Sequence, residues 1–167
     1  CRQVKELGYK VFVQPVSLTS YSDEEIIKLV EKVNMLEPYG ISIVDTYGLM
    51  FKKDLIRYFY LIDHNLRAET CIGYHSHNNF QLAFSNCVEL LKDANPARSL
   101  VLDSTLFGIG KSAGNAQTEL LANYLNSEYE KSYDMDQILE NIDINIKPIY
   151  QQSQWGYKID YFISAFN

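Results

Sequence analysis

The chain has 167 residues, of which 47% are hydrophobic, and a formal net charge of -6 at pH 7. This length fits one ordinary domain, and the negative charge argues against a nucleic-acid surface, which normally carries a basic patch. Charged residues interrupt the apolar runs before they are long enough to cross a bilayer, and no signal-peptide core opens the chain. We therefore expect a soluble, cytoplasmic protein without membrane contact, in which the unpaired cysteines Cys1, Cys71 and Cys87 are free thiols.

Predicted strands and helices alternate along the chain. Residues 2–7 resemble the last turns of a helix closed by Gly8, so we expect a piece of a longer protein. Ser22 and Glu25 have the spacing of a capping box, and Pro38 ends the helix that they begin. From hydrophobic periodicity we predict strands at 9–16, 41–45, 71–77 and 99–103, and helices at 22–37, 52–66, 80–92 and 115–126.

This alternation predicts an α/β fold of four parallel βα units. After Asn126 the apolar pattern stays helical and no further strand is expected, so we divide the chain into residues 1–126 and a helical extension at 127–167. In parallel α/β folds the chemistry lies at the carboxyl ends of the strands. Asp45, His75, His77 and Asp103 fall at those ends.

The segment 74–79, Tyr-His-Ser-His-Asn-Asn, carries two of the three histidines of the chain. Because successive side chains of a strand point to opposite faces, His75 and His77 project to the same side. Neutral imidazole is the commonest protein ligand for a transition metal, so the pair is a candidate metal site. The spacing alone leaves a second interpretation equally open, in which both histidines cap a sheet edge through backbone hydrogen bonds.

A glycine-rich loop at residues 108–115 precedes the last helix of the βα series. Its glycines would let the backbone approach an anion, but their spacing is not the dinucleotide-binding pattern. Asn115 is equally well interpreted as the N-cap of the following helix or as a ligand residue. Lys111 lies in the loop and is better explained as a solvated side chain than as a Schiff-base amine.

Three motifs at the ends of consecutive strands together resemble the metal-dependent lyase and aldolase superfamily of TIM barrels. They are Val44-Asp45-Thr46-Tyr47-Gly48; residues 73–83 with Asn86; and residues 103–110 with Ala113-Gly114-Asn115 and Glu119. That superfamily includes 4-hydroxy-2-oxovalerate aldolase, hydroxymethylglutaryl-coenzyme A lyase and isopropylmalate synthase. The resemblance implies a (β/α)8 barrel of which this chain holds strands five to eight, a partial barrel with a C-terminal helical extension.

The resemblance also implies roles for individual residues. His75 and His77 match the two histidine ligands of a divalent metal, and Asn115 matches the asparagine that joins the metal shell in the lyase branch. Thr46 and Asp45 match a turn near the bound keto acid, in which Thr46 would contact the substrate carboxylate and Asp45 would orient the metal shell. Asp45 is alternatively a strand-end carboxylate bonded to the neighbouring turn. Trp155-Gly156-Tyr157 resembles the terminal helix of the hydroxy-oxovalerate aldolases, which makes Tyr157 the candidate catalytic tyrosine. The sequence by itself favours the alternative, in which Tyr157 is one more aromatic residue in a tyrosine-rich tail.

The implied activity is retro-aldol cleavage of a 4-hydroxy-2-keto acid, and its reverse, through a pyruvate enolate. The implied cofactor is Mn or Mg, with Zn possible; the implied substrates are a small 2-keto acid and an aldehyde. A partner dehydrogenase or a homo-oligomer would also fit. The loop at 110–112 lacks the catalytic cysteine of the lyase branch, and Asn79 with Lys111-Ser112 departs from the synthase pattern, so the aldolase branch matches best.

Alternative functions of the chain remain possible. The metal-binding aspartate and the arginine of the family's first strand have no match before Val11, so we expect this chain to be an incomplete catalyst. A Claisen-type acyl transferase of the same superfamily and a non-catalytic relative remain alternatives. A hydrolase of the amidohydrolase type needs further histidine ligands, and His64, on a predicted helix, is the only other histidine.

Overall fold

The computed structural model describes residues 1–164, which form two compact units. The first unit contains residues 1–46, 50–75 and 88–103. The second contains residues 47–49, 76–87 and the chain from residue 104 on. The division predicted at residues 126 and 127 stays a prediction, and the last three residues of the predicted extension lie outside the described residues.

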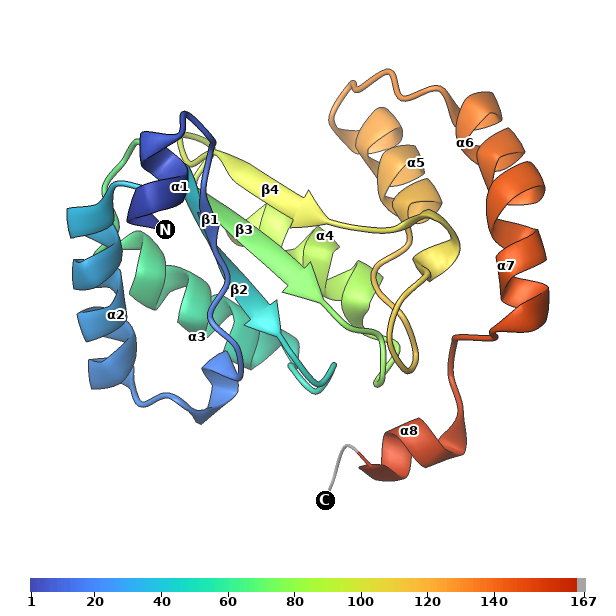
Figure 1. Ribbon diagram of the computed structural model, residues 1–167, viewed down its shortest axis with the longest axis horizontal. Coiled ribbons are helices and arrows are strands. Elements are labelled where there is room, and N and C mark those ends of the chain that lie inside the picture. Colours follow the sequence, from blue (N-terminus) through green and yellow to red (C-terminus); the bar gives the residue numbers. More distant parts are fainter. Residues whose placement is uncertain (165–167) are drawn as a thin grey trace. The chain divides into compact units, whose positions relative to one another are not determined.

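The first unit is built on a four-stranded sheet of order β1-β2-β3-β4 (Figure 1). The strands are β1 (Phe12–Val13), β2 (Gly40–Asp45), β3 (Cys71–Ser76) and β4 (Leu100–Asp103). β1 pairs with β2 in parallel, and β3 with β4 in parallel, with His75 in register with Asp103. Strand order that follows chain order is what a series of βα units produces, so the α/β fold and the partial-barrel architecture are confirmed.

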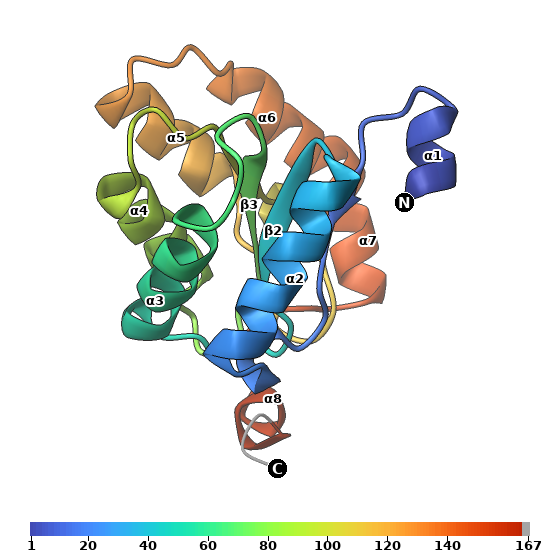
Figure 2. The same cartoon turned by 90° about the vertical axis from the view of Figure 1, so that its left-hand side faces the viewer.

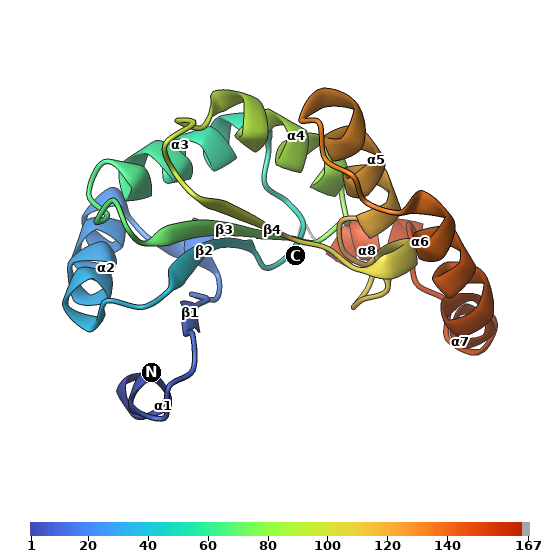
Figure 3. The same cartoon turned by 90° about the horizontal axis from the view of Figure 1, so that it is seen from above.

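Two helices of the first unit, α2 (Asp23–Leu36) and α3 (Lys52–Asp63), cover one face of the sheet (Figures 2 and 3). Because strand side chains alternate, Ile41, Ile43 and Ile72 all point to that face and are fully buried there. The capping box of Ser22 and Glu25 is present at the start of α2. The helical residues buried in this layer are Ile26, Val30, Val33, Leu55, Tyr58, Phe59 and Ile62.

Glycines make room on the other face of the sheet. A Cβ atom on Gly40 would overlap the ring of Phe12, and one on Gly73 would come within 2.4 Å of Oγ of Ser42. Both glycines therefore face side chains that lie too close for a larger residue without rearrangement. Gly73 thus leaves space on the face from which His75 projects two residues later.

Arg98 connects the end of α3 to the start of β3. Its side chain is 8% exposed, and its Nε lies 2.5 Å from Oδ1 of Asp63. The guanidinium also donates to the carbonyl oxygens of Arg67, Ala68 and Thr70. A buried cation with both a carboxylate and carbonyl partners is held in one geometry, and it fixes the loop from which the histidine strand begins.

Helices make up most of the second unit. They are η2 (Leu106–Gly108), α5 (Thr118–Glu128), α6 (Met135–Asn141), η3 (Ile142–Ile146), α7 (Lys147–Gln152) and α8 (Ile159–Ser164), with the first half of α4 (Ala83–Asp93). Figure 1 shows α6, the π-helical turn η3 and α7 as one rod beside α5. No strand follows β4 within residues 1–164, as expected. In the same range, no helix combines the length and the apolar character that crossing a membrane requires.

The structure corrects one expectation at the start of α5. The helix begins at Thr118, and its N-cap residue is Gln117 rather than Asn115. Asn115 is instead paired with His77 in an isolated antiparallel bridge. Because its backbone is engaged in that bridge, the capping interpretation of Asn115 is wrong, and its side chain needs another explanation.

Candidate functional site

His75 is oriented by a carboxylate. Its Nδ1 lies 3.1 Å from Oδ2 of Asp103, and both side chains are partly buried, with 27% and 32% exposed. The parallel register of β3 and β4 places the two residues side by side. When Nδ1 carries the hydrogen and donates to Asp103, Nε2 is the acceptor nitrogen of the ring. This carboxylate–imidazole pair is the arrangement that fixes metal-binding histidines in proteins.

Asp103 has a second partner, which strengthens its role as the orienting group. The side-chain amide of Gln14 donates to the same Oδ2 at 3.1 Å. Sequence reasoning noted Asp103 only as a strand-end residue and did not connect it with His75. The sequence signal that could have indicated this contact is that His75 and Asp103 both lie at the ends of neighbouring parallel strands.

The first unit also contains the two residues predicted to bind substrate. Oδ2 of Asp45 accepts a hydrogen bond from the backbone N–H of Met50 at 3.1 Å, so this buried carboxylate closes the turn that follows β2. Oγ1 of Thr46 accepts from the N–H of Ser17 at 2.8 Å. A hydroxyl that accepts one bond retains its own hydrogen for donation, so Thr46 is still equipped to bind a carboxylate.

In the second unit, His77 lies beside the glycine-rich loop. His77 and Asn115 form the antiparallel bridge, and the N–H of Asn78 donates to the carbonyl oxygen of Gly114 at 2.8 Å. Gly114 has φ of +84°, and a Cβ atom there would overlap the carbonyl oxygen of Gly108. The glycine is therefore required for the loop to fold back against the residues that follow the histidine strand.

The side chain of Asn115 is fixed at one end only. Its Nδ2 donates to the carbonyl oxygen of Ile109 at 3.1 Å, and a Cβ atom on Gly110 would come within 2.6 Å of the same nitrogen. Its Oδ1 is buried and accepts no hydrogen bond within residues 1–164. A buried polar atom without a partner costs about 1–3 kcal/mol, and an amide oxygen is a suitable ligand for a hard divalent cation.

These donors fit a divalent metal ion in part. In the first unit one histidine is oriented by a carboxylate, and in the second unit one amide oxygen is unsatisfied; an imidazole nitrogen and an amide oxygen are each ligand types for divalent metals. Among the described residues, however, no group of three or more His, Cys, Asp or Glu side chains is close enough to hold a metal.

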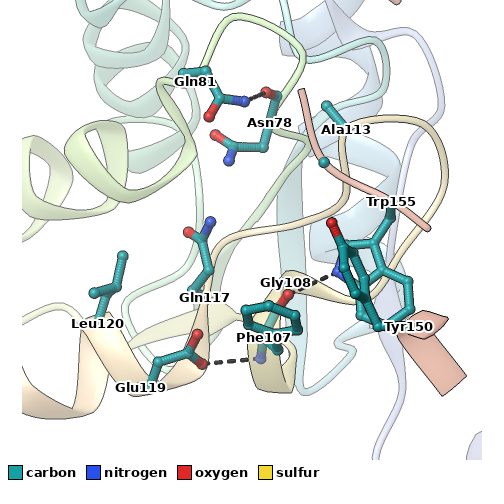
Figure 4. Close-up of a pocket in the computed structure, with 11 residues that line it drawn as sticks. Asn78, Gln81, Phe107, Gly108, Ala113, Gln117, Glu119, Leu120, Tyr150 and Trp155 are labelled. Atoms are coloured by element: carbon teal, nitrogen blue, oxygen red, sulfur yellow. Dashed lines mark hydrogen bonds between the residues drawn. The ribbon is translucent and has the colours of Figure 1, made fainter. Parts of the chain in front are cut away.

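A pocket of about 270 Å³ lies in the second unit (Figure 4). Sequence reasoning did not predict it, because its walls come from segments far apart in the chain. Asn78 and Ala113, which line it, are close in sequence to His77 and Asn115. The remaining lining residues are Gln81, Phe107, Gly108, Gln117, Glu119, Leu120, Tyr150, Trp155 and Gly156.

The predicted catalytic tyrosine follows directly on the pocket wall. Gly156 lines the pocket, and the next residue, Tyr157, is 53% exposed. The N–H of Gly156 donates to the carbonyl oxygen of Ser112 in the glycine-rich loop at 3.4 Å. Lys111 is exposed, as expected for a solvated loop lysine.

Comparison with known proteins finds relatives of this chain. A family model described as HMGL-like matches residues 1–145. A curated 4-hydroxy-2-oxovalerate aldolase of Geobacillus genomosp. 3 is 30% identical over 149 residues, which are 87% of this chain and 42% of that protein. The chain thus spans less than half the length of such a curated relative.

Solved structures show the same fold. The N-terminal domain of a candidate aldolase from Bacteroides vulgatus has a TM-score of 0.81 and 26% identity, covering 97% of this chain and 52% of that one. The HMG-CoA lyase of Bacillus subtilis has a TM-score of 0.72 and 19% identity, covering 90% of this chain and 52% of that one. In both comparisons the chain corresponds to about half of the matched protein.

Proposed function

The chain belongs to the HMGL-like family, and from this membership we propose that it is part of a divalent-metal-dependent aldolase that cleaves or forms a 4-hydroxy-2-keto acid. The curated relatives named 4-hydroxy-2-oxovalerate aldolase support the lyase class. The observation that carries the metal-dependent part of the proposal is the buried, unpartnered Oδ1 of Asn115. A ligand at this oxygen would satisfy it.

We propose His75, His77 and Asn115 as the metal ligands of this chain, with Mn or Mg as the metal. Side chains two residues apart in an extended segment point to the same side, as the two imidazoles would need to do. The bond from His75 to Asp103 supports a ring orientation in which Nε2 faces the ion. We propose that a carboxylate ligand comes from outside this chain; among the described residues no group of three or more His, Cys, Asp or Glu side chains could hold the ion.

The bound ion would supply Lewis acidity at the keto group of the substrate. The residues of this chain then have separate tasks in the cleavage. Thr46 donates its hydroxyl hydrogen to the substrate carboxylate, and Asp45 holds the turn that presents Thr46. Loss of the proton of the C4 hydroxyl breaks the bond between C3 and C4, which releases the aldehyde and leaves the pyruvate enolate, and protonation at C3 gives pyruvate.

The group that removes the C4 proton is a different residue from the two histidines. An imidazole whose lone pair is engaged as a ligand has no site left for a proton from the substrate, so His75 and His77 are excluded as the base. We propose Tyr157 as the catalytic residue of this chain at the reacting hydroxyl. Its position directly after the pocket residue Gly156 supports this role.

The test is elemental analysis of the protein at its natural length, purified without chelator. A His75→Ala, His77→Ala double variant is compared with His64→Ala, a matched control at the end of α3 whose ring stacks on Tyr60. We expect stoichiometric Mn or Mg in the wild type and the control, and none in the double variant. Pyruvate release from 4-hydroxy-2-keto acids should follow the metal content.

Further variants separate the parts of the proposal. Tyr157→Phe should lower kcat and leave the metal content unchanged. Tyr161→Phe, the control, should leave both kcat and the metal content unchanged. If the wild type holds no metal after Mn is added back, the metal-dependent aldolase is excluded. Metal without pyruvate release from any 4-hydroxy-2-keto acid would contradict the aldolase assignment and leave the metal site standing.

A further inference from the structure

The pocket of the second unit has an aromatic wall made of Phe107, Tyr150 and Trp155. The ring centroid of Tyr150 lies 4.8 Å from the ring centroid of Trp155 and 5.2 Å from that of Phe107, and both pairs have edge-to-face geometry. The indole Nε1 of Trp155 donates to the carbonyl oxygen of Phe107 at 2.8 Å, so the indole is held in place (Figure 4). The wall is thus a preformed apolar surface against which C–H groups can pack.

Polar side chains line the pocket elsewhere, and none of the lining residues is a lysine or an arginine. Gln81 donates to the carbonyl oxygen of Asn78 at 2.6 Å and retains its own side-chain oxygen as an acceptor. Oε2 of Glu119 accepts from the N–H of Phe107 at 3.0 Å, which leaves the second carboxylate oxygen. The side-chain amide of Gln117 makes no hydrogen bond to another described residue.

Two lining residues have left-handed backbone conformations that non-glycine residues rarely adopt. Phe107 has φ of +54° and Gln81 has φ of +58°. Both polar backbone groups of Phe107 are bound by side chains of the pocket, the N–H by Glu119 and the carbonyl by Trp155. Such strained conformations are costly and concentrate at ligand sites, where the surroundings hold them in place.

This lining selects a class of ligand. An acid would meet the Glu119 carboxylate without a cation to offset it, and an alkyl chain would bury the amide of Gln117 without a hydrogen bond. A carbon chain that carries hydroxyl groups fits both parts of the lining. Its C–H groups pack against the aromatic rings, and its hydroxyl groups form hydrogen bonds with the amide and carboxylate side chains. A volume of about 270 Å³ lies below the roughly 300 Å³ lower limit for drug-sized ligands, which indicates a chain of a few carbons.

We infer that this pocket binds the hydroxylated carbon chain of the aldehyde substrate, so that the enzyme acts on polyhydroxylated, sugar-like aldehydes. The inference rests on the proposed aldolase function. Its link to that function is that Asn78 directly follows the proposed ligand His77, while Ala113 lies two residues before Asn115. All lining residues belong to the same unit as these two ligands.

A binding experiment tests the pocket without reference to catalysis. Trp155 is the only tryptophan of this chain, so its fluorescence reports on the wall. The protein at its natural length is titrated with erythritol, 1-butanol, succinate and choline, and the signal of Trp155→Phe is subtracted. We expect a saturable change with erythritol alone; saturation with butanol, succinate or choline instead of erythritol would overturn the inference.

A kinetic experiment tests the substrate class. Pyruvate is condensed with glyceraldehyde or erythrose and, for comparison, with propionaldehyde or butyraldehyde. We expect kcat/KM to favour the hydroxylated aldehydes at least tenfold. The ratio should fall about tenfold in Gln117→Leu, the loss of one hydrogen bond of roughly 1.4 kcal/mol, and stay unchanged in the control Gln151→Leu, an exposed position on α7.

The two experiments distinguish the two proposals. Erythritol binding without condensation of any aldehyde would support the pocket and contradict the aldolase. Condensation without preference for hydroxylated aldehydes, and without erythritol binding, would overturn the inference and leave the aldolase intact.

Discussion

The amide of Asn115 is bonded at its nitrogen and unsatisfied at its oxygen. The carbonyl oxygen of Ile109 that receives the Nδ2 hydrogen also accepts from Oγ1 of Thr105 at 2.8 Å. Loss of the asparagine would therefore not leave this carbonyl without a donor. The retention of a buried, unpaired oxygen is a stability cost at the position where a ligand would remove it.

We predict that Asn115→Leu separates stability from metal binding. With EDTA present, the free energy of unfolding should change by less than about 1 kcal/mol, because removing the unpaired oxygen offsets the loss of one hydrogen bond. Affinity for Mn should fall at least about tenfold. Urea unfolding and titration calorimetry measure the two effects, with the exposed Asn145→Leu as control. A stability loss above about 2 kcal/mol in EDTA would show that the side chain is structural.

Helix α2 illustrates how local signals determine an element. The N–H and the hydroxyl of Ser22 donate to Oε2 of Glu25, at 2.8 and 3.0 Å, and the N–H of Glu25 donates back to Ser22 at 3.3 Å. These bonds satisfy N–H groups that the first turn of a helix leaves open and so stabilise the start of α2. The same backbone hydrogen bond from Ser22 is the main cause that lowers the pKa of Glu25.

This lowered pKa predicts a pH dependence of stability. A carboxyl group whose pKa is lower in the folded state stabilises the fold above its unfolded pKa, and the contribution is lost as the pH falls through the folded pKa. The stability difference between the wild type and Glu25→Gln should therefore be fully present at pH 7 and should decrease as the pH falls below the ordinary glutamate pKa of about 4.3. Urea unfolding at pH 7 and pH 3 measures it, with the exposed Glu31→Gln on the same helix as control. An equal difference at both pH values would contradict the capping role.

At the scale of the whole molecule, the chain corresponds to less than half of a curated aldolase and about half of the matched solved proteins. It supplies the parallel βα units, the histidine pair and the glycine-rich loop. Within residues 1–164, no group of three or more His, Cys, Asp or Glu side chains could hold a metal ion.

We predict that metal binding stabilises the protein at its natural length. An ion that binds the folded state adds a stability of RT ln(1 + [L]/Kd), about 2.7 kcal/mol at a hundredfold excess over Kd. MnCl2 should raise Tm in the wild type and in His64→Ala, EDTA should reverse the rise, and the His75→Ala, His77→Ala variant should show none. Scanning calorimetry measures these shifts. An equal rise of Tm in the double variant would place the ion elsewhere.

The sequence alone determined the order and type of the elements, because hydrophobic periodicity, the capping box and Pro38 act over a few neighbouring residues. It also marked His75 and His77, since alternation along a strand is local. It left open whether Asn115 caps a helix, and the structure decided this by pairing its backbone with that of His77.

Contacts between segments distant in the chain emerge only when the elements pack together. The partnership of His75 with Asp103 depends on the register of two strands, 28 residues apart. The unsatisfied oxygen of Asn115 depends on how the glycine-rich loop folds back, and the pocket depends on Trp155 reaching Phe107 across 48 residues. Local propensity cannot specify such contacts, because they form only when packing brings separate elements to a common place.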